Sequence, residues 1–461
     1  MTSHCSHSEP ADVGRREFVR LGAVGLGAAL TGTGIPSRPA DLTHPTTDQD
    51  PGQPFRAPPM DEVRIGFVGV GGMGQVHVRN LLDLDGARIK AICDIVPEKV
   101  AKMQQATVAA GQPRPTGYFR GETDFVRMCE EEELDLVYTA TPWRWHVPVL
   151  LAAMRNGKHA ASEVPMATTV EDCWRLVEAA ERYGKHCVMM ENVNYGRAEM
   201  MVFRMVRLGL FGEILHGECG YLHDLRAVKF ADEGEGLWRR EHAKHRNGNL
   251  YPTHGLGPVA NCMDNNRGDR FESLVSMSSP SRGLQLWAEE HYPPRHPKRR
   301  ETYVLGDVNT SLIRTAGGRT IFLSHDTNLP RPYSRIHLVQ GTRGIFQGYP
   351  DRLHLEQRSP AHEWEDAGAY YEEFEHPLWR AIGRTAPGRG HGGMDYLEDY
   401  RLIKCLRDGT PTDMNVYDGV SLSVVSELSE RSVATGSQPQ EFPDFTRGKW
   451  RTNPRLGVIE A

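Results

Sequence analysis

The stretch from Val63 to Asp94 constrains this chain more than any other part of the sequence. An apolar run over 63–68 leads directly into Gly69-Val-Gly71-Gly-Met-Gly74, a G-x-G-x-x-G turn. A helical pattern from Gln75 to Leu82 follows, and a second apolar run ends at Asp94. Glycines in such a turn let the backbone approach a pyrophosphate, and the start of the helix presents free N–H groups to it. The order of strand, turn, helix, strand and acid therefore predicts a nucleotide site.

Asp94 indicates which nucleotide this site binds. It follows Gly74 by about twenty residues, the separation typical of the carboxylate that binds a ribose 2′-hydroxyl. A carboxylate would repel the 2′-phosphate of NADP, so the sequence favours NAD. We expect Gly69, Gly71, Gly74 and Asp94 to contact this cofactor. The alternative is a glycine-rich turn inside an ordinary α/β sheet.

Length, net charge and cysteine spacing indicate which kinds of protein this chain can be. The chain has 461 residues, which is enough for two domains with full cores. Its formal net charge of -6 gives no basic surface, so we expect no nucleic-acid partner. Its 8 cysteines form no C-x-x-C pairs, which argues against a zinc ribbon or a disulfide framework. His242 and His245 make no convincing ligand pair, and we expect no metal.

The first forty residues have the features of a twin-arginine export signal. Arg15-Arg16 is followed by Phe18 and by a weakly apolar, glycine- and alanine-rich run over 21–30. That run is too short to span a bilayer as a mature helix, so we expect no stable membrane insertion. We predict a signal over 1–40, a flexible leader over 41–60, and export to the periplasm or the medium. The alternative is a disordered tail that happens to contain Arg-Arg.

The next part of the chain alternates between helical and strand patterns. This alternation predicts a doubly wound parallel sheet, a Rossmann dinucleotide-binding domain, over 61–191. The expected helices are 97–110, 125–133, 147–156 and 170–183, and the expected strands after Asp94 are 134–140, 159–163 and 186–191.

The pattern then changes to a run of strands. After a helix over 199–208, we expect strands at 212–221, 273–278, 302–305, 308–315, 320–325 and 335–340. Long loops rich in glycine, proline and charge separate them, notably 226–257 and 280–300. The sequence therefore predicts an α+β domain over 192–461 with a mostly antiparallel open sheet, whose open face could form a homo-oligomer.

Candidate site residues gather in four clusters. Trp143-Arg144-Trp145-His146 lies at the carboxyl end of a predicted parallel strand, where such sheets bind ligands. The other clusters are Glu163-Val164-Pro165, Tyr221 to Arg226, and Tyr251-Pro252-Thr253-His254. Each also has a structural interpretation. The tryptophans could belong to the core, the histidines could brace a loop or a helix, and Arg226 and Arg239 could be solvated surface charges.

Together these motifs resemble the Gfo/Idh/MocA oxidoreductase superfamily and, within it, glycoside hydrolase family 109, the NAD-dependent α-N-acetylgalactosaminidases. The resemblance runs from about residue 61 to about residue 450. It rests on Trp143 to His146, Glu191-Asn192-Val193, Gly220-Tyr221 with His223 to Arg226, Arg246-Asn247-Gly248, Tyr251 to Gly255, His325 to Thr327 with Arg331 to Tyr333, and Gly390 to Tyr396.

The resemblance implies a glycosidase that uses its nicotinamide without net oxidation. NAD-dependent glycosidases are exceptions to the usual pair of carboxylates. In the implied reaction NAD⁺ takes a hydride from C3 of the sugar, and the resulting ketone acidifies the proton on C2. Elimination at C1, addition of water and return of the hydride follow. Sugar dehydrogenases of the superfamily commonly carry Glu-Lys-Pro, whereas Val164 stands at the lysine position here.

The resemblance also assigns residues. His223 is our predicted base, Tyr221 and His254 are predicted to handle the C3 hydroxyl, and Glu163 could assist or could only position the cofactor. Two alternatives remain open, a sugar oxidoreductase that releases NADH and a non-catalytic glycan-binding protein. The implied NAD contacts are Gly72, Met73, Asp94, Trp143, Arg144, Trp145, His146, Glu163, Val164 and Asn192, and the implied sugar contacts are Tyr221, Arg239, Tyr251, Pro252, Thr253, His254 and Tyr333.

Overall fold

The computed structural model describes residues 55, 57–383, 385–386 and 388–457. The predicted signal over 1–40 and most of the predicted leader over 41–60 lie outside these residues. None of the helices within the described residues combines the length and the apolar composition that a membrane crossing needs. Every cysteine in the described ranges is buried and unpaired.

The first half of the described chain forms a parallel sheet with the strand order of a Rossmann fold. The order is β3-β2-β1-β4-β5-β6, and every neighbouring pair is parallel. The chain therefore changes direction across the sheet between β1 and β4, and this switch point is where such sheets bind ligands. The strands are β1 (Val63–Val68), β2 (Ala87–Cys93), β3 (Thr116–Tyr118), β4 (Leu136–Thr139), β5 (His159–Ser162) and β6 (Cys187–Met189).

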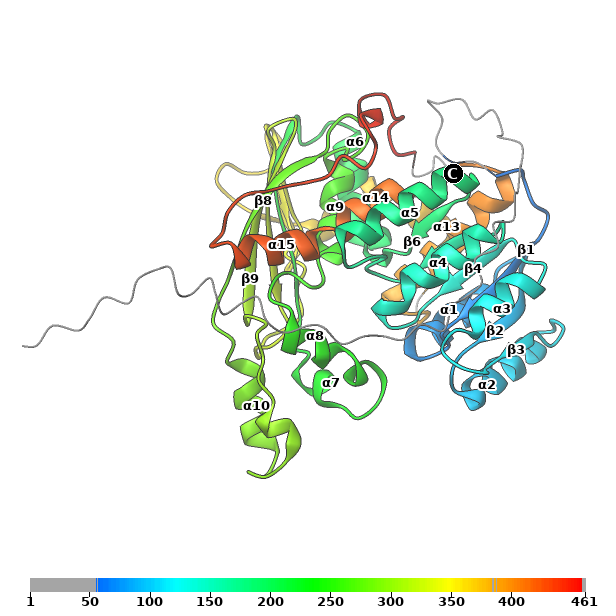
Figure 1. Cartoon of the computed structure of the whole chain (residues 1–461). Helices are drawn as coiled ribbons and strands as arrows, with labels where there is room; N and C mark the ends of the chain where they lie inside the picture. Colours follow the sequence, from blue (N-terminus) through cyan, green and yellow to red (C-terminus); the bar gives the residue numbers. More distant parts are fainter. Residues whose placement is uncertain (1–54, 56, 384, 387, 458–461) are drawn as a thin grey trace, which may run out of the picture. The chain divides into compact units, whose positions relative to one another are not determined.

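Helices cover both faces of this sheet (Figure 1). Local sequence explains the bounds of α5 (Val170–Tyr183), because the Thr169 side chain accepts from the Asp172 N–H and Gly184 ends the helix with φ 60°. These are the bounds predicted from the sequence. The other helices of this half are α1 (Gly72–Leu82), α2 (Pro97–Ala109), α3 (Asp124–Glu131) and α4 (His146–Arg155).

The second half is built on a large sheet with the order β14-β13-β12-β11-β7-β10-β9-β8-β15. Its neighbours pair antiparallel, apart from the parallel pair β7 and β10. The predicted α+β domain with a mostly antiparallel sheet is therefore confirmed. The strands are β7 (Ile214–Leu222), β8 (Phe271–Ser278), β9 (Val308–Thr315), β10 (Thr320–Asp326), β11 (Leu338–Gly341), β12 (Gly344–Gln347), β13 (Arg352–Leu355), β14 (Glu365–Asp366) and β15 (Gln440–Glu441).

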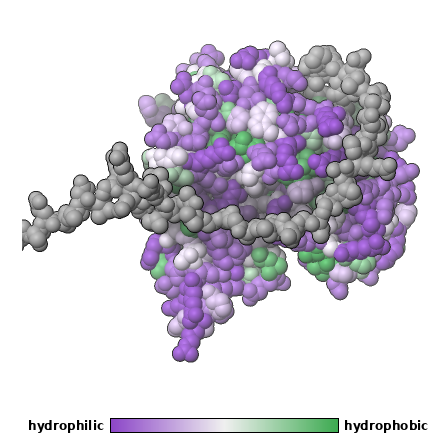
Figure 2. All heavy atoms as spheres, viewed as in Figure 1, coloured by the Kyte–Doolittle hydropathy of each residue, from purple (hydrophilic) through white to green (hydrophobic). Residues whose placement is uncertain are grey.

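Helices α9 (Thr253–Cys262) and α15 (Val425–Ala434) pack on one face of this sheet, and α6 (Arg197–Arg207) packs on α9 (Figure 1). On the sheet, Met277 and Leu312 each expose 60% of their surface. Figure 2 shows one face of the molecule, where the described surface is mainly hydrophilic with small, separate apolar patches. Oligomer formation through the open face stays a prediction.

Two expectations about the second half were wrong. The predicted strand over 302–305 is an irregular segment, because the N–H groups of Val304 and Leu305 donate to the Ala243 carbonyl instead of to a neighbouring strand. The predicted loops over 226–257 and 280–300 contain short helices. These are α7 (Arg226–Phe230), α8 (Arg239–His245) and α10 (Gly283–His291).

The last part of the described chain returns to the nucleotide-binding half. Helix α13 (Met394–Asp408) packs against α1, and α14 (Val416–Ser423) packs against α5. The short helices α11 (Tyr371–Phe374) and α12 (Pro377–Ile382) precede them. A division of the sequence at 191/192 assigns α13 to the second domain, but this helix places its side chains beside the glycine turn.

Candidate active site

The glycine turn forms a cradle that fits a dinucleotide. A Cβ on Gly74 would lie 1.9 Å from the Gly69 carbonyl oxygen, so only glycine lets the helix start this close to the strand. At Gly71 and Gly72 a Cβ would meet nothing within 4 Å, so the outer side of the turn is open. No side chain caps the start of α1, which leaves its first N–H groups for an anionic ligand.

Asp94 closes the other side of this cradle. Its two carboxylate oxygens accept from the N–H groups of Val70 and Val96, each at 2.9 Å. These bonds fix the carboxylate at the carboxyl end of β2, next to the turn, and the side chain stays partly exposed. The donor set of the turn and this anchored carboxylate fit the pyrophosphate and ribose of NAD.

The structure separates the four residues from Trp143 to His146. The Trp143 ring is buried and stacks with Tyr251, with centroids 5.8 Å apart. Trp145 packs on Phe125, and Arg144 pairs with Glu122 at the surface. His146 is buried, and its ring nitrogens lie 2.7 Å from the Pro165 carbonyl and 2.8 Å from the Thr141 carbonyl. Of the four, Trp143 joins the aromatic cluster of the site, whereas His146 braces the loops after β4 and β5.

Glu163 follows β5 and meets a residue that the sequence did not single out. Its Oε1 lies 2.8 Å from Nε2 of His77, which is fully buried on α1. The other ring nitrogen of His77 lies 2.9 Å from an oxygen of Asp399 on α13. The next residue, Val164, is buried. The only sequence signal for His77 was its place three residues after Gly74, a position that by itself indicates helix packing.

Aromatic and basic side chains from the second half converge on one cluster. The Tyr221 hydroxyl lies 3.2 Å from Nδ1 of His223. The Tyr221 ring centroid lies 4.5 Å from that of Tyr251, 5.5 Å from that of His254 and 6.1 Å from that of Tyr333. The Arg239 guanidinium stands over the rings of Trp143, Trp238 and Tyr251. This cluster brings the predicted base His223 together with most of the predicted sugar contacts, namely Tyr221, Arg239, Tyr251, His254 and Tyr333.

His254 is held by a buried carboxylate. Its Nδ1 lies 2.7 Å from Oε1 of Glu191, which follows β6. The imidazole is 12% exposed, so Nε2 is the nitrogen left for a ligand. Pro252 precedes the first turn of α9, and Thr253 is buried within it. These two residues lie next to His254 at the start of α9, and their contact with the sugar stays a prediction.

A second unforeseen histidine lies at the start of α13. His391 Nδ1 is 2.9 Å from Oδ2 of Asp395, and Oδ1 of Asp395 accepts from the Asn192 side chain at 2.6 Å. The His391 side chain is 52% exposed, whereas that of Asp395 is buried. The hydrogen bond to Asp395 raises the pKa of His391. The sequence signal was the glycine-rich motif from Gly390 to Gly393, which carries part of the family resemblance but indicates no role for its histidine.

Electrostatics connect the two halves of the site. Burial, followed by the Arg239 guanidinium, lowers the pKa of His223, which favours a neutral imidazole. Burial raises the pKa of Tyr251 well above its usual range, and the charge on Glu163 adds to this shift. The charge on Glu163 also contributes to the raised pKa of His391. The sugar-side cluster, Glu163 and His391 therefore lie within electrostatic reach of one another.

Comparison with known proteins decides the family. Residues 195–452, more than half of the chain, match the family model described as the C-terminal domain of glycosyl hydrolase 109. This chain belongs to glycosyl hydrolase family 109. Residues 63–191 match the Gfo/Idh/MocA family model, described as the NAD-binding Rossmann fold of an oxidoreductase family.

Relatives agree with this family 109 assignment, and solved structures show a similar fold. A family 109 protein from Shewanella pealeana is 46% identical over 451 residues, covering 96% of this chain and 99% of the relative. One from Shewanella baltica is 49% identical over 411 residues, covering 88% and 90%. Among solved structures, a levoglucosan dehydrogenase in complex with NADH and levoglucosan superposes with a TM-score of 0.64 at 20% sequence identity. The match covers 83% of this chain and 100% of the dehydrogenase chain. This structure shows the shared fold, and the cofactor of the family 109 chain is NAD.

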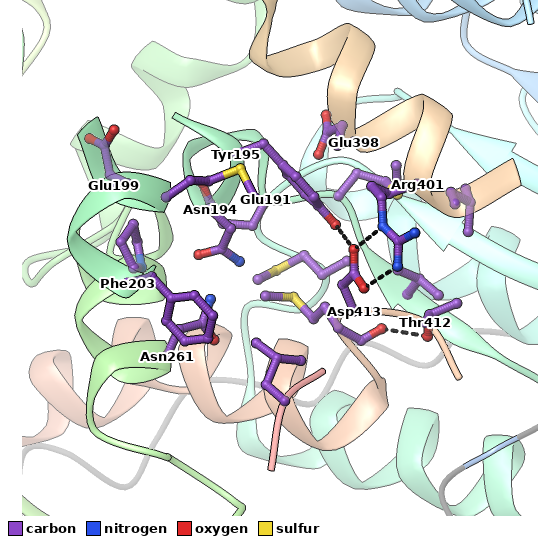
Figure 3. A pocket seen from close by; sticks show the side chains of 18 residues that line it. Glu191, Asn194, Tyr195, Glu199, Phe203, Asn261, Glu398, Arg401, Thr412 and Asp413 are labelled. Atoms are coloured by element: carbon purple, nitrogen blue, oxygen red, sulfur yellow. Dashed lines mark hydrogen bonds and ion pairs between the residues drawn. The ribbon is translucent and has the colours of Figure 1, made fainter. Parts of the chain in front are cut away.

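A buried pocket of the family 109 chain lies behind the Glu191 carboxylate (Figure 3). Methionine and other apolar side chains line most of it, and Tyr195 donates to Asp413, which also pairs with Arg401. Among the described residues that line this pocket, none belongs to the predicted NAD or sugar contacts. The pocket therefore does not mark the active site. No group of three or more His, Cys, Asp or Glu side chains in the described ranges is placed to hold a metal.

Proposed function

We propose that this family 109 chain hydrolyses terminal α-linked N-acetylgalactosamine through oxidation, elimination, addition and reduction, with no net redox change. One observation carries the proposal: two histidines of the second domain, each with an oriented ring, lie in one cluster beside the NAD site. The His223 ring is oriented by Tyr221 and the His254 ring by Glu191. A plain dehydrogenase needs only one proton acceptor, whereas this route moves protons at two sugar positions.

Reversible hydride transfer at C3 of the sugar is the chemistry that a bound nicotinamide supplies here. His254 accepts the C3 hydroxyl proton at Nε2, because Glu191 occupies Nδ1 and orients the ring. His223, kept neutral by burial and by Arg239, removes the proton at C2. Both assignments follow the ordinary capacity of imidazole to work as a base near neutral pH.

His391 completes the set of proton carriers. Its exposed ring, charged through its contact with Asp395, can donate a proton to the departing oxygen at C1. Trp143, Tyr251 and Arg239 form a wall of aromatic faces and one guanidinium, which suits the apolar and polar faces of a sugar ring. Val164 supports a glycosidase over a sugar oxidoreductase, because the lysine common in the dehydrogenases of the superfamily is absent.

The test is release of p-nitrophenol from the aryl α-N-acetylgalactosaminide with nicotinamide absorbance recorded at the same time. We expect sustained release without accumulation of NADH, and slower release from the matching α-galactoside and α-N-acetylglucosaminide. NADH that accumulates in step with loss of sugar would make the chain an oxidoreductase. Binding without turnover of any aryl glycoside would make it a glycan-binding protein.

We also propose that the chain is exported by the twin-arginine route. The support is the Arg15-Arg16 pair followed by Phe18 and the apolar run over 21–30. The test compares cell fractions for the intact chain and for Arg15→Lys with Arg16→Lys. Activity that stays outside the cytoplasm in the double variant would contradict this proposal.

A further inference from the structure

A chain of buried charges runs from the active site into the protein. Glu163 follows β5, His77 lies on α1 and Asp399 lies on α13. His77 Nε2 is 2.8 Å from Glu163 Oε1, and His77 Nδ1 is 2.9 Å from Asp399 Oδ2. The side chains of His77 and Asp399 are fully buried, whereas that of Glu163 is 18% exposed. Glu163 is therefore the partly exposed member of this chain of charges, and His77 lies on its buried side.

The geometry makes His77 an imidazolium. A carboxylate can only accept, so an imidazole with a carboxylate at each nitrogen must donate from both. Burial alone would lower the pKa of His77, but Asp399 and Glu163 outweigh it and raise this pKa well above its usual range. The same contact holds the pKa of Glu163 below its usual range despite burial. Tyr138 on β4 places its hydroxyl 3.0 Å from Nδ1 of the ring.

The other titratable groups around His77 do not remove its charge. Burial raises the pKa of Asp399, whereas the charge of His77 and the hydrogen bonds from His77 and from Asn80, the latter at 3.0 Å, favour its ionised form. The neighbouring Glu398 has no hydrogen-bond partner within the described residues, and burial raises its pKa well above the usual range, which makes it neutral. Asp395 is paired with His391. The cluster therefore has Glu163 and Asp399 on either side of one fixed cation.

The strand order places Glu163 on the nicotinamide side of the cofactor. Asp94 marks the ribose at the end of β2, and the pyrophosphate lies at the turn after β1. The remaining half of a dinucleotide crosses the switch point toward β4 and β5, and Glu163 follows β5. Trp143, which follows β4, is the other predicted NAD contact at this end.

We propose that His77 is a positioning residue that keeps Glu163 ionised and fixed, and that the Glu163 carboxylate makes the site prefer the positively charged NAD⁺ over the neutral nicotinamide of NADH. Helix α1 then acts on two parts of the cofactor, on the pyrophosphate through the N–H groups of its first turn and on the nicotinamide through His77, which holds Glu163. The inference concerns cofactor binding alone and does not depend on the sugar chemistry proposed above.

The test measures the dissociation constants of NAD⁺ and NADH with the whole chain and without any sugar. In Glu163→Gln and in His77→Gln we expect the preference for NAD⁺ over NADH to fall by about tenfold. Because both variants remove the same interaction, the double variant should match the single ones. His159→Gln is the matched control, since it removes a buried histidine of the same half of the chain, at the opposite end of β5 from Glu163. It should leave the preference unchanged.

An unchanged preference in His77→Gln or in Glu163→Gln would overturn the proposal, as would equal weakening of both nucleotides. If His77→Gln fails to fold, Asp399→Asn provides the second variant. Removal of one of the two carboxylates lowers the pKa of His77, so the preference for NAD⁺ should then decline as pH rises through the neutral range. A preference in Asp399→Asn that is as independent of pH as in the unmodified chain would refute the role of His77 equally well.

Discussion

His254 Nδ1 lies 2.7 Å from Oε1 of Glu191, a contact that joins the first turn of α9 to the residues after β6. The backbone of α9 packs so closely on Glu191 that it leaves little room for any other arrangement of the two side chains. A Cβ on Gly257, one turn further along α9, would lie 3.1 Å from Cγ of Glu191 and 2.8 Å from the Asn194 side chain. The close approach of α9 thus fixes which nitrogen of His254 faces the aromatic cluster.

Loss of the Glu191 carboxylate should therefore impair turnover without loss of NAD. We expect Glu191→Gln to lower kcat about a hundredfold, because an amide does not hold the His254 ring in the orientation that the carboxylate fixes. The NAD dissociation constant should change little. Thr412→Val is the control, since Thr412 lines the pocket behind Glu191 and bonds only the Met414 carbonyl there. Equal losses of kcat in both variants would mean that the substitutions disturbed the pocket and not the contact between Glu191 and His254.

Replacement of the predicted base should be more severe. We expect His223→Ala to abolish hydrolysis while NAD stays bound, because the C2 proton then has no acceptor. The measurement is p-nitrophenol release together with the NAD content of the purified protein. His216→Ala on the same strand is the control, as its ring contacts Thr320 on the other side of the sheet. Near-normal hydrolysis in His223→Ala would exclude His223 as the base.

The pH profile of kcat/KM should depend on two histidines with opposite roles, His223 as a base and His391 as an acid. His223 acts when neutral, and its lowered pKa places the acid limb of kcat/KM below the ordinary range of histidine. His391 acts when protonated, and its raised pKa places the alkaline limb above that range. Asp395→Asn removes the first cause of that raised pKa, so the alkaline limb should move to lower pH. Glu122→Gln, at the surface beside Arg144, should leave both limbs in place. An alkaline limb that does not move would remove His391 from the reaction.

Two glycines of the turn should respond differently to the same added methyl group. In Gly74→Ala the Cβ meets the Gly69 carbonyl oxygen at 1.9 Å, so we expect a lower Tm and loss of NAD binding. In Gly72→Ala the Cβ meets no protein atom within 4 Å, so the Tm without NAD should stay near normal while NAD affinity falls. Thermal unfolding with and without NAD separates the two cases. An unchanged NAD affinity in Gly72→Ala would place the cofactor elsewhere.

The parallel sheet should lose stability in mild acid. Burial lowers the pKa of His159 to about 3 and that of His186 to about 4, and their rings lie 4.9 Å apart. Because the unfolded chain binds these protons near pH 6.5, their contribution is complete above that pH and is lost as the pH falls toward 4. We expect the free energy of unfolding to drop by roughly 6 kcal/mol over this range, about 3 kcal/mol for each histidine. Chemical denaturation of His159→Gln at several pH values should show a shallower slope, and an equal slope would contradict the assignment.

Local sequence determined the elements whose causes are local. The strand, glycine turn and helix from Val63 to Leu82 follow from a few contiguous residues, and so do the cap at Thr169 and the stop at Gly184. The type of the second sheet also followed, because runs of strand pattern without intervening long helices favour antiparallel pairing. The segment 302–305 differs, since its partner is Ala243 and a pattern of alternation does not name a partner.

The tertiary structure decided which residues act together. Their adjacency in the sequence led us to predict that Trp143 to His146 all contact NAD. In the structure the short helical turn there places Trp143 in the aromatic cluster and buries His146 against two carbonyls. His77 and Asp399 stand 322 positions apart and meet only because α13 returns to pack on α1. Periodicity along a chain records which face of an element is buried. It does not record which distant element covers that face, and the charge on His77 depends on two distant partners, Asp399 and Glu163.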